Sequence, residues 1–424
     1  MTYPSRPLLL CDLTQSYAPH GGGGIGTYLR EKQRYVLEHT PHRLLQIVPG
    51  PEDRIVEQGR HIWVEVGADQ VRGSPNYRFI MRTGVVREVL ERYRPDLIES
   101  QCPWVLPWTA INYGKAFPET ALVAGYHTDF PEAHIYRVGS SLFGSFVASG
   151  LRRLATGYAQ LTYREFDRVY TLSAVMAQAL GEYGIAHVDV LALGVDTGLF
   201  HPQQRDPVWR DSLGLKARGP LLVYAGRLDN EKRAYRLLEM FKRLPSSLDA
   251  GLVLIGDGKL RATLEEHSQG WQVAFPGFIA DRAQLARALA SADIYVSAMA
   301  DETFGISVIE AQASGLPIVG VASGAMPERV PGGTGVLVPV NDTSAMARAV
   351  ACLWRGQHRA MGQAARHHVA GRFEWPQTFE SLLGEVYPKA LQASQFRMGK
   401  GRSGWSGPGV GFNRDGIRQA VRRS

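Results

Sequence analysis

Two glutamates eight positions apart, Glu302 and Glu310, are the side chains of this sequence that are best placed to do chemistry. A short apolar strand is expected just before them, over residues 293–297, and a helix is expected from Ile306 to Ser314. In an open α/β sheet, ligands bind beyond the carboxyl ends of the strands. Carboxylates accept hydrogen bonds from hydroxyl groups, so the pair predicts a site for a sugar. The alternative is that the two acids only stabilise the start of a helix.

A cationic segment follows the strand that we expect over residues 221–225. Arg227 stands at the end of that strand, and Lys232 stands at the start of the next helix. A planar guanidinium and an ammonium above one sheet edge suit a pyrophosphate. Taken alone, the segment is equally well explained by solvated surface charges.

A run of glycines, Gly21 to Gly24 followed by Gly26, lies between a strand over residues 8–11 and a helix over residues 25–38. Glycines let backbone amides approach an anion, and a helix N-terminus favours negative charge; a flexible connection is the alternative. The run also fits the dinucleotide pattern G-x-G-x-x-G, which requires an acid at the end of the second strand. The first acid after that strand is Glu52, too far on, which disfavours a nicotinamide or flavin cofactor.

His127 and Asp129 follow a strand expected over residues 121–126, again at the carboxyl edge of a sheet. A histidine in such a place is structural about as often as it is catalytic. The sequence has no Asp-x-Asp pair and no His/Cys cluster with metal-ligand spacing, so we expect no bound metal.

The composition, 45% hydrophobic and 21% charged, is that of a soluble globular protein. Its 424 residues exceed one ordinary core and predict two domains with a remainder. We find no apolar run that could span a bilayer and no secretory signal at the N-terminus. The three cysteines are far apart, as expected of small buried side chains in a reducing compartment, and we expect a cytoplasmic protein.

The net charge of +7 is carried by the C-terminal end of the chain. Residues 388–424 contain eight basic residues and one acid, so residues 1–387 are formally neutral. The body is therefore not a basic platform, and we expect no nucleic-acid partner. The tail is rich in Gly, Ser and Arg and is expected to be disordered. It is either a functionless extension or an anchor for an anionic membrane surface.

Strands and helices alternate along the chain, which predicts an α/β fold with parallel sheets covered on both faces. The expected strands lie at residues 8–11, 44–48, 62–66, 97–99, 121–126, 168–172, 188–191, 221–225, 252–255, 273–275, 294–297, 318–321 and 336–338. Two similar series flank the segment 194–202, so we expect two doubly wound, Rossmann-like domains facing a cleft. The expected division is an N-terminal domain over residues 1–193, a linker over 194–202, a C-terminal domain over 203–372, a closing helix over 373–387 and a tail over 388–424.

Together these segments resemble the retaining family-four (group 1) glycosyltransferases of the GT-B fold. The resemblance covers about residues 7–387 and rests on Gly23 to Tyr28, His127, Gly226-Arg227 with Lys232, and Glu302 with Glu310. The family usually has glycine after its lysine, where this chain has Arg233.

The resemblance implies transfer of a hexose from a UDP- or GDP-linked sugar to a hydroxyl acceptor, with retention of configuration and without a metal or other cofactor. The C-terminal domain would bind the donor and the N-terminal domain the acceptor. The implied donor-binding groups are Gly23 and Gly24 amides, Arg227 and Lys232 for the diphosphate, Glu310 for the ribose, and Glu302 with the amides of Phe304, Gly305 and Ile306 for the sugar. The implied catalytic residues are Glu302 and His127, the latter near the reacting carbon of the sugar.

The phrase His127-Thr128-Asp129-Phe130-Pro131 is similar to family members that act on diacylglycerol-type or lipid-linked acceptors. An apolar and basic segment at residues 142–154 would meet such an acceptor at a membrane surface, so we expect peripheral association with the inner face of the cell membrane. The alternatives are a nucleotide-sugar epimerase or phosphorylase of the same two-domain plan, and a non-catalytic protein that binds a sugar nucleotide.

Overall fold

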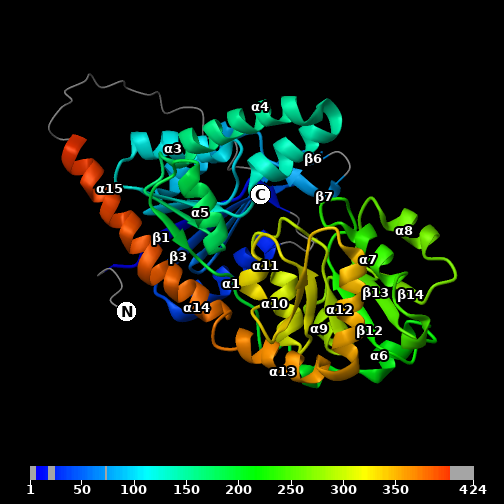
Figure 1. The fold of residues 1–424 in the computed structure, drawn as a ribbon. Coiled ribbons are helices and arrows are strands. Elements are labelled where there is room, and N and C mark those ends of the chain that lie inside the picture. The colour runs from blue at the N-terminus through cyan, green and yellow to red at the C-terminus, as the bar shows by residue number, and fades with distance from the viewer. Residues whose placement is uncertain (1–5, 18–23, 72–73, 402–424) are drawn as a thin grey trace.

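The computed structural model describes residues 6–17, 24–71 and 74–401. Two large sheets lie in separate lobes, each with helices packed on it, and the chain crosses between the lobes twice (Figure 1). The expected α/β architecture is confirmed. Among the described residues, every helix is too short or too polar to cross a lipid bilayer.

The first lobe is built on an eight-stranded sheet in the order β11-β10-β9-β8-β1-β3-β5-β4. All neighbours pair in parallel except β4, which runs antiparallel to β5. The bounds are β1 Leu9–Leu13, β3 Arg43–Gly50, β4 Arg54–Gln58, β5 His61–Gly67, β8 Leu97–Ser100, β9 Ala121–Tyr126, β10 Arg168–Thr171 and β11 Val188–Val190. Strand β4 was not predicted, because it is an exposed edge strand without the apolar run that marks the others.

Helices cover this sheet, and one of them lies along the outer edge of the lobe. The bounds are α1 Gly24–His39, α2 Thr83–Tyr93, α3 Leu106–Ala116, a π-helical turn η1 Pro131–Tyr136, α4 Arg137–Tyr163 and α5 Ala174–Glu182. A small antiparallel sheet adds β2 Ser16–Tyr17, β6 Gln70–Val71 and β7 Ser74–Phe79. Helix α4 runs along the top of the lobe in Figure 1.

The second lobe contains a parallel six-stranded sheet in the order β14-β13-β12-β15-β16-β17, and each of its strands was predicted. The strand bounds are β12 Leu221–Ala225, β13 Gly251–Ile255, β14 Val273–Gly277, β15 Ile294–Val296, β16 Ile318–Val321 and β17 Gly335–Val338. The helices are η2 Pro202–Gln204, α6 Pro207–Ser212, α7 Ala234–Phe241, η3 Ser246–Leu248, α8 Arg261–His267, α9 Arg282–Ala290, α10 Ile306–Ala313, α11 Met326–Arg329, α12 Thr343–Gly356 and α13 His358–Val369.

The C-terminal helices return to the first lobe and continue further than we expected. They are α14 Trp375–Ser381, a π-helical turn η4 Leu382–Val386 and α15 Tyr387–Gly401, and they lie along the side of the first lobe in Figure 1. The expected boundary at residue 388 is therefore wrong, since residues 388–401 are helical. Two basic side chains find acids on the body, Lys389 at 3.0 Å from Asp189 and Arg397 at 2.9 Å from Asp167. The remainder of the tail, residues 402–424, lies outside the described residues.

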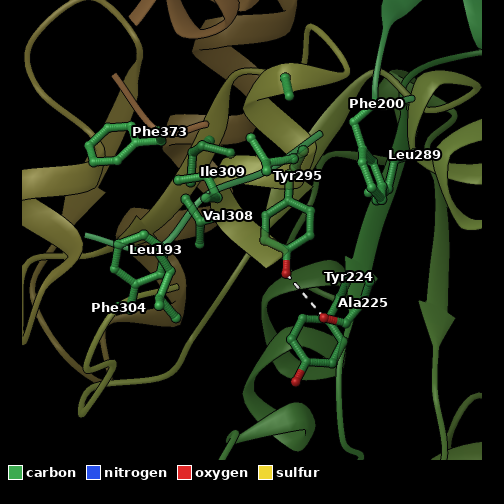
Figure 2. Packing of buried hydrophobic residues seen from close by; sticks show 14 of the residues in the cluster. Leu193, Phe200, Tyr224, Ala225, Leu289, Tyr295, Phe304, Val308, Ile309 and Phe373 are labelled. Atoms are coloured by element: carbon green, nitrogen blue, oxygen red, sulfur yellow. Dashed lines mark hydrogen bonds between the residues drawn. The ribbon is translucent and has the colours of Figure 1, made fainter. Parts of the chain in front are cut away.

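Apolar packing fixes the helix that carries Glu310. Val308 and Ile309 of α10 are buried, and Figure 2 shows them beside Phe304 and Phe373. In the same cluster the hydroxyl of Tyr295 donates a 3.3 Å hydrogen bond to the carbonyl of Ala225 at the end of β12 (Figure 2). The strand ends and α10 therefore form one rigid platform for the site.

Candidate functional site

The N-termini of α1 and α10 meet between the two lobes. A Cβ atom added to Gly24, the first residue of α1, would lie 3.6 Å from Cδ1 of Ile306, the first residue of α10. Neither helix has an acid in its first turn, so their positive ends are not neutralised from within. This region favours an anion. Gly23, which we expected to contact phosphate, lies outside the described residues.

Lys232 and Glu302 contact each other at the carboxyl edge of the second sheet. Nζ of Lys232 lies 3.4 Å from Oε2 of Glu302 and 2.8 Å from Sδ of Met299. Their side chains are 23% and 13% exposed, so both are shielded by the protein but still reach solvent. The structure thus brings together an expected phosphate ligand and an expected sugar ligand.

The backbone holds the loop of Glu302 in place. Its carbonyl oxygen accepts a 2.7 Å hydrogen bond from the amide of Ala325. A Cβ atom on Gly324 would lie 2.5 Å from that oxygen, and φ of Gly324 is +58°, so the position requires glycine. The chain then enters α10 through Gly305, which places the expected Ile306 amide at the helix N-terminus.

Arg227 lies in the same turn as Lys232, and one acid organises both residues. Nη1 of Arg227 lies 2.5 Å from Oδ2 of Asp229, and Nη2 lies 2.5 Å from Oε2 of Glu231. The other oxygen of Asp229 accepts a 2.9 Å hydrogen bond from the amide of Lys232. The side chain of Arg227 is 50% exposed, so it can exchange these partners for a phosphate.

Arg233 adopts a left-handed backbone, with φ +54°, at the position where the resembled family has glycine. Glycine adopts this conformation at lower cost, which accounts for the family's preference. The guanidinium donates to Oδ1 of Asn341 at 2.8 Å, so Arg233 is held by the protein itself.

Glu310 is buried beneath the site and is paired with an arginine that the sequence analysis missed. Its Oε1 accepts a 2.6 Å hydrogen bond from Nη2 of Arg282, whose guanidinium lies over the ring of Phe200. Burial raises the pKa of Glu310, and Arg282 opposes that rise. A lone arginine at the start of a helix carries no spacing signal, so this partner could not be predicted from the sequence.

Arg329 connects the two lobes, and it was not predicted either. Its Nε donates to the carbonyl of Phe304 at 3.1 Å, and its Nη2 donates to the carbonyl of Leu172, in the first lobe, at 2.7 Å. The guanidinium lies over the ring of Phe304, 4.3 Å from its centre. Burial lowers the pKa of Arg329 to about 10. The loop between Glu302 and α10 is thereby tied to the first lobe.

His127 lies at the carboxyl end of β9 and is half-buried. Its Nε2 is hydrogen-bonded to Oε1 of Gln101 and lies 3.5 Å from the hydroxyl of Tyr170. Its ring is 6.1 Å from that of Tyr28, in the first turns of α1. Burial lowers the pKa of His127 to about 4, so the ring is neutral at neutral pH. Asp129, which we considered beside it, accepts instead from the hydroxyls of Tyr126 and Tyr183 at 3.2 Å.

The arrangement is suited to a diphosphate joined to a polyhydroxylated group. Cations and two helix N-termini lie at one place, and carboxylates that accept from hydroxyl groups lie beside them. Within the described residues, no group of three or more His, Cys, Asp and Glu side chains could hold a metal ion.

Comparison with known families and proteins agrees with this geometry. Residues 22–199 match "Glycosyltransferase Family 4", and residues 219–355 match "Glycosyl transferases group 1". A GDP-mannose-dependent alpha-mannosyltransferase of Mycobacterium tuberculosis is 30% identical over 387 residues, which are 88% of this chain and 94% of that protein. A GDP-mannose-dependent alpha-(1-6)-phosphatidylinositol dimannoside mannosyltransferase of the same species is 29% identical over 88% of this chain and 95% of its own.

Solved structures resemble the whole fold. Sucrose-phosphate synthase of Thermosynechococcus elongatus superposes with a TM-score of 0.70 at 20% identity, covering 94% of this chain and all of that chain. The Anabaena protein HepE, solved in complex with UDP-glucose, gives a TM-score of 0.67 at 20% identity over 90% of this chain and 99% of its own.

Proposed function

The chain belongs to the group 1 glycosyltransferases of family 4 and has their GT-B fold, and we propose that it transfers mannose from GDP-mannose to a hydroxyl group of a glycolipid or lipid-linked glycan. The GDP-mannose dependence of the relatives supports the donor, and the phosphatidylinositol dimannoside named for one of them supports the acceptor class.

The observation that carries the proposal is the 3.4 Å contact between Lys232 and Glu302. An ammonium that binds a diphosphate and a carboxylate that binds a sugar hydroxyl must lie this close if one ligand contains both groups. Arg227 in the same turn adds a second cation for the diphosphate, and Gly24 of the opposite lobe adds a helix N-terminus.

The proposed reaction breaks the bond between the anomeric carbon of the sugar and the β-phosphate oxygen. Negative charge then grows on the departing diphosphate, and Arg227 and Lys232 stabilise that charge more in the transition state than in the bound donor. The acceptor hydroxyl attacks from the face that the diphosphate leaves, and a phosphate oxygen takes its proton, so the configuration is retained. No metal ion is assigned a part in this mechanism.

Two other side chains orient the donor. Glu310 accepts hydrogen bonds from the ribose hydroxyls, and Arg282 opposes the rise in its pKa that burial causes. A neutral His127 faces the transferred sugar from the first lobe.

Donor binding and turnover test the proposal separately. We expect GDP-mannose to raise the unfolding temperature more than UDP-glucose at the same concentration, because the proposed donor has the lower Kd. A ligand at 100 times its Kd stabilises a protein by about 2.7 kcal/mol. Arg227→Ala is expected to lose this stabilisation, whereas Glu302→Gln is expected to keep much of it and to lose mannosyl transfer. Glu266→Ala, at an exposed position of α8, is the matched control for a lost carboxylate and is expected to change neither. Stabilisation by UDP-sugars alone would contradict the proposed donor.

We further propose that helix α4 brings the enzyme to the membrane surface where a lipid acceptor lies. Its exposed apolar side chains include Phe146 at 92% and Leu154 at 73% exposure, next to the basic Arg153. Apolar side chains beside a basic one suit an anionic lipid interface. In Figure 1 the helix runs along the top of the first lobe.

Flotation with anionic phospholipid vesicles tests this contact. The double variant Phe146→Ser/Leu154→Ser is expected to lose vesicle binding, and a chain ending at Gly401 measures the contribution of residues 402–424. Val208→Ser, on α6 of the other lobe and 74% exposed, is the control for the loss of one exposed apolar side chain. Equal flotation of the double variant and the unchanged protein would refute a role for α4.

A further inference from the structure

A buried polar cluster lies directly behind His127 and has no part in the function described so far. Its centre is the carboxylate of Glu99, which is fully buried at the end of β8. Oε1 accepts from the hydroxyls of Tyr28 and Tyr170, both at 2.8 Å. Oε2 accepts from Nζ of Lys32 at 3.0 Å and from the hydroxyl of Tyr387, which α15 contributes. Five donors, counting the amide of Gln101, therefore converge on this carboxylate.

These donors keep Glu99 ionised. Burial by itself raises the pKa of this carboxyl, but Lys32 and the tyrosine hydroxyls outweigh burial and leave its pKa below the usual value. Lys32 is itself held by Asp12 on the opposite side. An ionised carboxylate can only accept hydrogen bonds. Any group that turns toward Glu99 must therefore present a donor.

Gln101 lies between Glu99 and His127 and determines which ring nitrogen of His127 carries the proton. Nε2 of Gln101 donates to Oε1 of Glu99, so its Oε1 points the other way, to Nε2 of His127. The reverse orientation of the amide would set its oxygen against a carboxylate oxygen, which is unfavourable. Because Oε1 of Gln101 is an acceptor, Nε2 of His127 must carry the proton. The neutral ring then has its lone pair on Nδ1.

The contact between Gln101 and His127 requires glycine at position 125, because a side chain there would occupy the same space. A Cβ atom on Gly125 would lie 2.6 Å from Nε2 of His127 and 2.7 Å from the hydroxyl of Tyr170. Within the described part of the chain, Nδ1 of His127 has no hydrogen-bond partner. The ring is half-buried with its Nε2 side against Gln101, which leaves Nδ1 as the nitrogen for a ligand.

We propose that Gln101 is a positioning residue that fixes His127 as the tautomer protonated at Nε2, so that Nδ1 accepts a hydrogen bond from a hydroxyl group of the transferred sugar. The role of the sugar rests on the function proposed above, whereas the tautomer does not. His127 is then an acceptor toward the donor sugar and not a general acid. Glu99 and Lys32 act on the site only through the orientation of one amide.

A second glutamine, Gln46, joins a carboxylate to a histidine in the same way and provides a control. Gln46 donates from Nε2 to Asp12 at 3.0 Å and faces Nε2 of His61 with its Oε1, also at 3.0 Å. Gln46 therefore joins a carboxylate of the same cluster to a histidine as Gln101 does, but it contacts neither Glu99 nor His127. Both glutamines are buried, so Gln46→Leu is a control for the loss of a buried amide.

The tautomer can be measured without turnover. The protein is labelled with ¹⁵N-histidine, the ring nitrogens are observed by long-range ¹H–¹⁵N NMR, and His127 is assigned by the signals lost in His127→Gln. We expect a protonated Nε2 and an unprotonated Nδ1 that persist between about pH 6 and 8. In Gln101→Leu we expect a mixture of both tautomers, and in Gln46→Leu we expect no change. Protonation at Nδ1 in the unchanged protein, or an unaltered ring in Gln101→Leu, would overturn the proposal.

A double-mutant cycle tests whether Gln101 acts through His127. Gln101→Leu is expected to lower kcat about tenfold, with KM for the nucleotide-sugar changed less than about threefold, whereas Gln46→Leu lowers only the unfolding temperature. In a His127→Ala background, Gln101→Leu is expected to cost almost nothing further. An equal loss in both backgrounds would show that Gln101 does not work through the ring. If the unchanged protein transfers no sugar, the proposed function fails, and the NMR measurement still decides the tautomer.

Discussion

Nη2 of Arg329 donates a 2.7 Å hydrogen bond to the carbonyl of Leu172, so an arginine of the second lobe is bonded to the residue that follows strand β10 of the first lobe. The neighbouring Glu328 extends this contact, because its carboxylate accepts from the amides of Ala174 and Val175 at the start of α5, at 3.2 and 3.0 Å. The same guanidinium binds the carbonyl of Phe304. The loop that carries Glu302 and Phe304 is therefore tied to the first lobe through Arg329.

Replacement of Arg329 by methionine is expected to lower both the free energy of unfolding and the activity. It leaves the carbonyls of Leu172 and Phe304 buried without a donor, which costs about 1–3 kcal/mol of unfolding free energy. Because the proposed function places the transferred sugar on this loop, we expect kcat/KM to fall roughly tenfold. Chemical denaturation and initial rates measure the two effects. Arg359→Met, at an exposed position of α13, is expected to leave both unchanged, and an unaffected Arg329→Met would contradict the coupling.

Lys232→Met removes the cation that we propose stabilises the departing diphosphate. Loss of one group that stabilises developing charge typically lowers kcat by about 10²- to 10³-fold, and we expect a reduction in this range. Lys216→Met removes an exposed lysine of the same lobe and serves as the control in the same steady-state assay. A Lys232→Met enzyme with nearly normal kcat and only a raised KM would mean that Lys232 binds the donor without favouring the transition state.

The sequence was sufficient to predict the strands of both large sheets because most are buried apolar runs. It failed at β4, whose exposed residues lack such a run, and at residues 388–401, where a basic composition suggested disorder. That composition could not reveal that Lys389 and Arg397 would find Asp189 and Asp167 on the body. Ion pairs between distant segments leave no mark on local composition.

The site residues that follow a strand could be predicted from the sequence, whereas those that contact the site from other elements could not. Lys232 and Glu302 each stand just beyond a strand, so topology brings them to one edge. Arg282, Arg329 and Gln101 reach the site through single contacts from other elements, and no spacing connects them to it.

Arg282→Met is expected to destabilise the folded protein, because it leaves the buried Glu310 without its cationic partner. The pKa of Glu310 is already raised by burial, and without the guanidinium that opposes this rise it will rise further. We expect a loss of roughly 2–3 kcal/mol of unfolding free energy, less than for a fully buried pair, because Arg282 is 34% exposed. Adding Glu310→Gln should recover much of this loss while donor binding stays weak. Additive losses in the double variant would argue against the pair.

His127 is expected to make the protein less stable as the pH falls from 6.5 to about 4. Its pKa is lowered to about 4 in the folded protein by burial, so the unfolded chain binds a proton in this window that the folded chain does not. Stability therefore rises with pH through the window, and the full effect of this one group is about 3 kcal/mol. His127→Gln keeps an amide that can donate to Gln101 but cannot titrate, so its stability should fall less steeply than that of the unchanged protein. Denaturation curves recorded at several pH values compare the two, and parallel curves for both proteins would show that the folded protein does not hold His127 neutral.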